Sequence, residues 1–180
     1  MPIHLILGGA RSGKSHHAEK LAKASGLPVS VIVTAEGLDE EMRLRIERHR
    51  LDRPTDWRTV ECPLHLADAL RAESTPGRCV IVDCLTLWLA NLLGDADRQP
   101  HPSSIGALTA LQRERAALMA ALPQLPGEII LVANEVGLGL VPETPLGRLF
   151  RDEAGRLNQT LAALSDKVSF VAAGLSLSLK

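Results

Sequence analysis

The stretch that decides the fold is IHLILGGARSGKS, residues 3–15. The aliphatic run at Ile3–Leu7 is typical of a buried strand, and it leads directly into a glycine-rich turn. Residues 8–15 match the pattern G-x-x-x-x-G-K-S/T in full. A helical pattern follows over Lys14–Ser25 and stops at Gly26. Because the pattern lies between a strand and a helix, it predicts a phosphate-binding loop rather than a glycine turn with a chance Lys-Ser.

The spacing within this loop has a chemical reason. Glycines let the backbone curl so that successive N–H groups point at one anion, and the following helix adds its positive N-terminal end. Lys14 supplies a mobile charge for the β- and γ-phosphates, and the Ser15 hydroxyl is a ligand for Mg²⁺. The loop therefore predicts that a nucleoside triphosphate and Mg²⁺ bind here, with Lys14 acting in catalysis.

Beyond the loop, short aliphatic runs alternate with helical patterns along the chain. Continuous apolar strands separated by helices are typical of a parallel sheet covered on both faces. We therefore predict an α/β fold with a mostly parallel sheet, helices on both faces, and one nucleotide-binding domain over residues 1–180. The expected strands are Ile3–Leu7, Val29–Thr34, Trp57–Val60, Cys79–Asp83, Glu128–Ala133 and Val168–Ala173. The expected helices are Lys14–Ser25, Asp39–Leu51, Leu64–Glu73, Leu85–Leu93, Ile105–Leu122 and Leu146–Leu164.

Composition excludes several classes of function. The formal net charge is −1 and aromatic residues make up 2% of the chain, so nucleic-acid binding is disfavoured. No apolar stretch approaches the roughly 20 residues of a spanning helix, and the N-terminus lacks the basic region of a signal peptide. The three cysteines, Cys62, Cys79 and Cys84, form no C-x-x-C pair. These features indicate a cytoplasmic protein without a membrane span.

A magnesium site needs an anionic partner for Ser15. Asp83 ends the strand pattern Cys79–Asp83, four apolar residues followed by a carboxylate, as in a Walker B strand. The carboxylate is expected at the C-terminal edge of the sheet, beside the phosphate loop. Its alternative role is to cap the helix that starts at Leu85, and the two roles are compatible.

An arginine-rich helix is expected over Asp39–Leu51. The segment from Arg43 to Arg53, which begins in this helix and runs past its end, carries His49 among five arginines, Arg43, Arg45, Arg48, Arg50 and Arg53. One interpretation is a solvated helix that Glu47 partly neutralises. The other is an anion-handling helix, because arginine forks bind phosphates bidentately. A neutral histidine among them can attack an α-phosphorus and carry the nucleotide as a phosphoramidate.

Taken together, these segments resemble the bifunctional adenosylcobinamide kinase / adenosylcobinamide-phosphate guanylyltransferase family. The resemblance is carried by GGARSGKS (8–15), VTAEGLDEEMRLRIERHRLDRPTDWRTVECP (33–63), VDCLTLWLANLL (82–93), NEVGLGLVPETPLGRLFRDEAGRLNQ (134–159) and SFVAAGLSLSLK (169–180). It runs nearly end to end, and the second and fourth segments are more specific than the phosphate loop. Residues 94–104 have the least to match.

The resemblance implies a RecA-like P-loop fold, a homotrimer and two reactions of cobalamin biosynthesis. A nucleoside triphosphate, ATP or GTP, first phosphorylates adenosylcobinamide. GTP then transfers GMP to a histidine, which falls on His49, and adenosylcobinamide phosphate takes the GMP to give adenosylcobinamide-GDP. The family's nucleotide-contacting positions fall on Gly8, Gly9, Ala10, Arg11, Ser12, Gly13, Lys14, Ser15, Val33, Thr34, Ala35, Arg50, Leu51, Asp52, Arg53, Glu61 and Asp83. Ser15 and Asp83 are the expected metal ligands.

Two carboxylates keep open roles. Glu61 follows the expected strand Trp57–Val60, and its carboxylate suits either the guanine N–H groups or the ribose hydroxyls. Glu135 is either a base for the cobinamide hydroxyl or a loop carboxylate that orders backbone amides. Two rival functions also stay open: a plain P-loop kinase in which His49 is idle, and a non-catalytic nucleotide switch.

Overall fold

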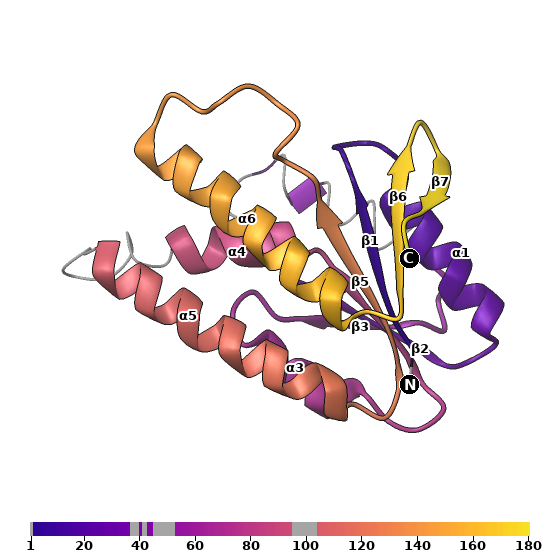
Figure 1. Ribbon diagram of the computed structural model, residues 1–180. Helices are drawn as coiled ribbons and strands as arrows, with labels where there is room; N and C mark the ends of the chain where they lie inside the picture. The colour runs from indigo at the N-terminus through magenta and orange to yellow at the C-terminus, as the bar shows by residue number, and fades with distance from the viewer. Residues whose placement is uncertain (1, 37–39, 41–42, 45–52, 95–103) are drawn as a thin grey trace.

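The computed structural model describes residues 2–36, 40, 43–44, 53–94 and 104–180 (Figure 1). Within these residues, seven strands form one sheet in the order β3-β2-β4-β5-β1-β6-β7. The strands are β1 Ile3–Gly8, β2 Val29–Val33, β3 Arg58–Glu61, β4 Cys79–Asp83, β5 Glu128–Asn134, β6 Lys167–Ala172 and β7 Leu175–Ser178. The helices are α1 Lys14–Ser25, α3 Leu66–Glu73, α4 Leu85–Gly94, α5 Ser104–Ala121 and α6 Pro145–Leu164, with a short 3-10 turn at Leu122–Gln124.

The first six strands are parallel to their neighbours in the sheet. This arrangement confirms the predicted α/β class with a mostly parallel sheet. Strand β5 lies between β1, which leads into the phosphate loop, and β4, which ends at Asp83. This order places the phosphate loop and Asp83 at the ends of the two strands that flank β5.

Helices cover both faces of the sheet, and the strand side chains explain why. In β1, Leu5 and Ile6 are both fully buried although neighbouring side chains point to opposite faces. Leu5 belongs to the core under α3, α4, α5 and α6, whereas Ile6 belongs to the core under α1. Figure 1 shows α4, α5 and α6 on one side of the sheet and α1 on the other. A strand that is apolar on both sides needs this cover.

The larger core contains one aromatic side chain that also needs a hydrogen-bond partner. Trp88 on α4 is fully buried, and its indole Nε1 donates to the Leu64 carbonyl oxygen at 2.7 Å. The Leu64 carbonyl also accepts from the Leu66 backbone N–H. Leu64 therefore belongs to the turn before α3, which begins at Leu66 rather than at the expected Leu64.

The antiparallel strand β7 is the one element of the sheet that the sequence did not predict. Its pattern, LSLS, alternates as a strand should, but all four residues are exposed. The strand pairs with β6 through a two-residue turn at Ala173–Gly174. Predicted and observed ends of the other elements agree within about two residues, the usual uncertainty of such bounds.

Two further predicted segments lie largely outside the described residues. The predicted helix Asp39–Leu51 lies mostly outside them, although Glu40, Arg43 and Leu44 are helical. The predicted loop at residues 94–104 lies almost wholly outside them. Among the described helices, none has the length and apolar character needed to cross a membrane.

Candidate active site

The carboxyl ends of the parallel strands bring the predicted site residues to one edge of the sheet. Gly8 is in register with Asn134, and Val33 is in register with both Glu61 and Asp83. In parallel α/β sheets, ligands bind outside this edge. Sequence positions up to 126 residues apart, from Gly8 to Asn134, are thereby placed along one line.

The phosphate loop has the backbone conformation that its glycines suggested. Gly13 adopts φ 99° and caps α1 without any side-chain hydrogen bond, and Arg11 also has positive φ, at 55°. The N-cap residue therefore has no side chain that could compete for the N–H groups of the first turn of α1. A helix N-terminus of this kind, opening from a glycine loop, suits a phosphate group.

Lys14 and Ser12 are buried within the loop. Lys14 is 8% exposed, and its Nζ donates to the Gly9 carbonyl oxygen at 2.7 Å, so its ammonium group lies over the loop. Ser12 is 9% exposed, and its hydroxyl has no hydrogen-bond partner in the described protein. A buried hydroxyl without a partner is costly, which suits a site that a polar ligand completes.

The first glycine of the loop is required by close packing. A Cβ added at Gly8 would lie 2.3 Å from the Val171 carbonyl oxygen of β6. The backbone of β6 therefore leaves no space for any other residue here. The Gly8 carbonyl oxygen also accepts from the Glu135 backbone N–H at 3.0 Å, which ties the loop after β5 to the phosphate loop.

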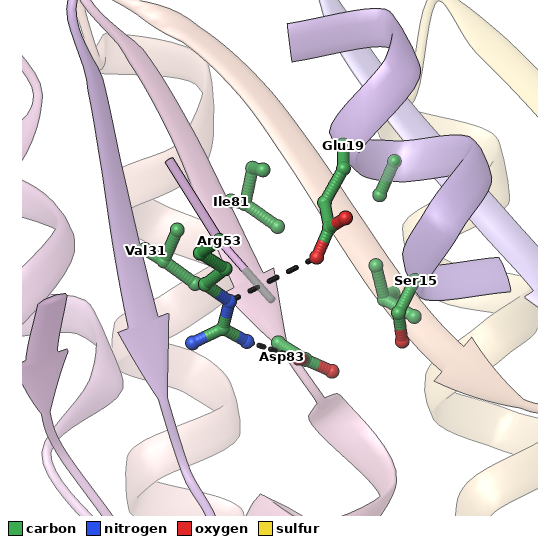
Figure 2. Close-up of a pocket in the computed structure, with 8 residues that line it drawn as sticks. Ser15, Glu19, Val31, Arg53, Ile81 and Asp83 are labelled. Atoms are coloured by element: carbon green, nitrogen blue, oxygen red, sulfur yellow. Dashed lines mark hydrogen bonds and ion pairs between the residues drawn. The ribbon is translucent and has the colours of Figure 1, made fainter. Parts of the chain in front are cut away.

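Asp83 lies in a pocket with Ser15, Glu19 and Arg53 (Figure 2). Arg53 Nη2 donates to Asp83 Oδ2 at 2.7 Å, and Arg53 Nε lies 3.9 Å from Glu19 Oε1. The Arg53 side chain is only 6% exposed, so this ion pair is screened little by water. Burial raises the pKa of Glu19, while the Arg53 guanidinium opposes that rise.

The pocket offers hard oxygen donors that fit Mg²⁺. The Ser15 hydroxyl and the Asp83 carboxylate both line it, and oxygen ligands are those that Mg²⁺ takes in proteins. Two protein ligands are enough for this ion, because it keeps several waters and binds the phosphates of its substrate. Within the described residues, no cluster of three or more His, Cys, Asp or Glu side chains forms a metal site of another kind.

Among residues 33–35, which were predicted to contact the nucleotide, the Thr34 side chain makes hydrogen bonds within the protein. The Thr34 hydroxyl donates to the Cys84 carbonyl oxygen at 2.6 Å and accepts from the Cys84 N–H at 3.0 Å. The Thr34 carbonyl oxygen accepts from Asn91 Nδ2 at 2.7 Å. Thr34 therefore locks the end of β2 to the end of β4. Val33 is buried and Ala35 is half-buried beside it.

Of the remaining predicted site residues, Glu61 and Glu135 lie within the described part of the chain and residues 49–52 lie outside it. Glu61 is the last residue of β3 and is exposed. Glu135 Oε1 accepts from the Gly137 backbone N–H at 2.6 Å, the contact expected of a carboxylate that orders loop amides. The proposed nucleophile His49 lies outside the described residues, as do Arg50, Leu51 and Asp52.

Sequence reasoning missed Glu19, which lines the pocket and faces Arg53. The signal was available in the spacing, because residues four apart lie on one side of a helix and Glu19 follows Ser15 by four. The ion pair of Arg53 with Asp83 was not available from spacing, because 30 residues separate them.

The sequence model of the family described as cobinamide kinase / cobinamide phosphate guanyltransferase matches residues 4–179. This chain belongs to that family. Family membership makes the chain a bifunctional enzyme, kinase and guanylyltransferase, of cobalamin biosynthesis, as the sequence predicted.

Curated relatives of the family match over nearly the whole chain. The bifunctional adenosylcobalamin biosynthesis protein CobP of Pseudomonas aeruginosa is 54% identical over 176 residues, which cover 98% of this chain and 96% of that protein. The bifunctional adenosylcobalamin biosynthesis protein CobU of Escherichia coli is 45% identical, with 98% of each chain covered. The Salmonella typhimurium protein of the same name is 42% identical over the same share.

Solved structures with a similar fold are much more distant. The RadB recombinase is 14% identical, with a TM-score of 0.48 over 94% of this chain and 73% of that chain. The flagellar accessory protein FlaH from Methanocaldococcus jannaschii is also 14% identical, with a TM-score of 0.47 over 99% of this chain and 78% of that chain.

Proposed function

We propose that this chain phosphorylates adenosylcobinamide with ATP or GTP and then guanylylates the product through a covalent His49–GMP intermediate. The observation that carries the proposal is the meeting of the phosphate loop with Asp83 in one pocket, in a chain that matches the family over residues 4–179. The arginine-rich segment 43–53, with His49 inside it, supports the second reaction.

In the kinase step, the aminopropanol hydroxyl of adenosylcobinamide attacks the γ-phosphorus. The bond from that phosphorus to the β-bridging oxygen breaks, a nucleoside diphosphate leaves, and the hydroxyl proton is released. The loop N–H groups and Lys14 bind the phosphates and offset the charge on the transferred group. Because little covalent chemistry is asked of the protein in such transfers, positioning by this loop supplies most of the catalysis.

In the guanylyl step, a ring nitrogen of His49 attacks the α-phosphorus of GTP and pyrophosphate leaves. A phosphate oxygen of adenosylcobinamide phosphate then attacks the same phosphorus. The P–N bond breaks, adenosylcobinamide-GDP forms, and His49 is free again. Two displacements on one phosphorus predict ping-pong kinetics for this half-reaction.

The nucleotide is proposed to contact residues 8–15, 33–35, 50–53, Glu61 and Asp83. Ser15 and Asp83 would hold Mg²⁺, which neutralises charge on the bound phosphates. The ion pair of Arg53 with Asp83, at 2.7 Å, supports this arrangement because it holds the carboxylate in the pocket. Support for Mg²⁺ comes from the oxygen donors of Ser15 and Asp83 that line the pocket.

The proposal also covers the domain organisation, oligomeric state and cellular location of the enzyme. We propose one nucleotide-binding domain over residues 1–180, a homotrimer, and a cytoplasmic location. The single sheet with two apolar cores supports the first. The family resemblance supports the second, and three cysteines without any C-x-x-C pair support the third.

One experiment separates this function from its rivals. The protein is incubated with GTP labelled at the α-phosphorus, denatured, and assayed for retained label. An acid-labile, alkali-stable adduct that vanishes in His49→Ala is the expected result. His4→Gln is the matched control, because it removes another histidine, on β1, and should keep the adduct.

Two other outcomes would decide against the proposal. Phosphorylation of adenosylcobinamide without any adduct would leave a plain P-loop kinase. Tight GTP binding without turnover of either kind would leave a nucleotide switch.

A further inference from the structure

The hairpin at the C-terminal end of the chain lies directly against the phosphate loop. Its turn, Ala173–Gly174, joins β6 to β7, and Figure 1 shows this hairpin beside α1. The Gly174 backbone N–H donates to the Ser12 carbonyl oxygen at 2.9 Å. A Cβ added at Gly13 would lie 3.2 Å from Gly174 Cα, so the two backbones pack as closely as glycines allow.

This hydrogen bond fixes the direction of a loop N–H group. In a planar trans peptide, the carbonyl and the following N–H point in opposite directions. When the Ser12 carbonyl points at Gly174, the Gly13 N–H must therefore point away from the hairpin. An anion that accepts from the Gly13 N–H would therefore have to lie on the side of this peptide that faces away from the hairpin.

The turn itself is held in an uncommon conformation. Gly174 has φ 77°, which glycine adopts freely, but Ala173 has φ 51°, which a residue with a Cβ rarely adopts. Strained residues persist where the surrounding structure over-determines them, and they gather at functional sites. At the other end of the loop, the Glu135 N–H holds the Gly8 carbonyl in a similar way. The hairpin thus secures the end of the loop that enters α1.

We infer that the Ala173–Gly174 turn is a positioning element of the phosphate loop. Gly174 acts through the Ser12–Gly13 peptide and sets one donor of the phosphate cradle. The inference rests on the proposed function only in that the loop binds a triphosphate. It assigns a role to the C-terminal hairpin, whose strand β7 otherwise has no buried residue.

The test removes the Gly174 N–H and leaves every side chain in place. An amide-to-ester replacement at Gly174, made by incorporating glycolic acid into the full chain, deletes the donor to Ser12. The matched control is the same replacement at Leu179, whose N–H donates to the Val168 carbonyl oxygen at 2.7 Å away from the loop. Both variants lose one backbone hydrogen bond of the same hairpin, so a general loss of stability affects both.

Affinities for GTP and GMP are then measured by calorimetry. We expect the Gly174 ester to weaken GTP binding roughly tenfold. Without the Gly174 N–H, the Ser12–Gly13 peptide is free to turn, and the Gly13 N–H loses its alignment with the charged phosphate. GMP binding should change less than about twofold, because GMP lacks the β- and γ-phosphates that the loop holds. The Leu179 ester should leave both affinities unchanged.

Each result points one way. Equal GTP affinity in the Gly174 ester and wild type would overturn the inference and leave the proposed function standing. Parallel losses in the Gly174 and Leu179 esters would also overturn it, because they would indicate a structural role only. If wild-type protein binds GTP no more tightly than GMP, the β- and γ-phosphates contribute no affinity. That result would overturn the proposed function and the inference together.

Discussion

Arg53 and Asp83 form an ion pair in the pocket that Ser15 of the phosphate loop also lines, with Nη2 2.7 Å from Oδ2 and with side chains 6% and 19% exposed. Arg71 and Asp68 form a second pair of similar length, 2.9 Å, but their side chains are 50% and 78% exposed. The two pairs differ in burial and in the distance along the chain between their partners, which is 30 residues for the first and three for the second. Arg71–Asp68 therefore serves as the exposed, local counterpart of the buried, long-range pair.

Replacing Arg53 by alanine should lower the free energy of unfolding by about 3 kcal/mol, because it leaves the Asp83 carboxylate largely buried without its partner. Arg71→Ala should cost less than about 1 kcal/mol, because exposed pairs contribute little. Urea denaturation of both variants provides the measurement. Equal losses would show that Asp83 is well solvated without Arg53.

Replacing Lys14 by alanine should reduce kinase turnover by roughly 100- to 1000-fold, the usual effect of removing one group that stabilises a transferred phosphoryl group. Lys20→Ala is the control, since Lys20 lies on the same helix but is exposed. Initial rates of adenosylcobinamide phosphorylation are measured for both, together with circular dichroism to confirm folding. Unchanged turnover in Lys14→Ala would contradict the phosphate-loop assignment.

A buried polar network at the opposite edge of the sheet should affect stability alone. Glu73 is 5% exposed, accepts from Ser30 Oγ at 2.9 Å, and pairs with Arg58 at 3.1 Å and Arg78 at 3.3 Å. Glu73→Ala should lower the free energy of unfolding by about 3 kcal/mol, because it leaves charged donors without an acceptor.

GTP affinity of the folded Glu73→Ala protein should match wild type, since the partners of Glu73 lie at or next to the amino ends of β2, β3 and β4, away from the carboxyl ends where the phosphate loop begins. Calorimetry below the unfolding transition tests this. A fall in affinity as large as the one in Lys14→Ala would mean that the two edges of the sheet are coupled.

Acid should weaken the fold in part through His4. Burial, followed by the charges of His17 and Lys167, lowers the pKa of His4 from its ordinary value of 6.5. The unfolded chain therefore binds more protons as pH falls through 6.5, so this contribution to stability is present above pH 6.5 and lost below it. In His4→Gln, the free energy of unfolding should fall less steeply between pH 7.5 and pH 5.5.

Urea denaturation across this pH range provides the measurement. The control is His16→Gln, which removes an exposed histidine of α1 and should keep the wild-type slope. Identical slopes in wild type and His4→Gln would show that folding does not lower the pKa of His4, although its Nε2 is hydrogen-bonded with Ser169 Oγ at 2.8 Å.

The sequence by itself was sufficient for features that neighbouring residues determine. The phosphate loop depends on glycines and a helix start within 13 residues, IHLILGGARSGKS, and its conformation follows from local backbone freedom. The same holds for Asp83, because the carboxylate directly follows an apolar strand and must emerge at the strand end. The parallel sheet followed from aliphatic strands buried on both faces.

Only the tertiary structure decided which distant groups meet at those features. Arg53 reaches Asp83 across 30 residues, and Gly174 reaches Ser12 across 162 residues, because β4 and β6 lie in the same sheet as β1. Strand β7 escaped prediction for a related reason. Its residues are exposed, so its alternating pattern records pairing with β6 and carries no burial signal. Backbone pairing and ion pairing between remote segments depend on the sheet order, and hydrophobic periodicity along the chain does not specify that order.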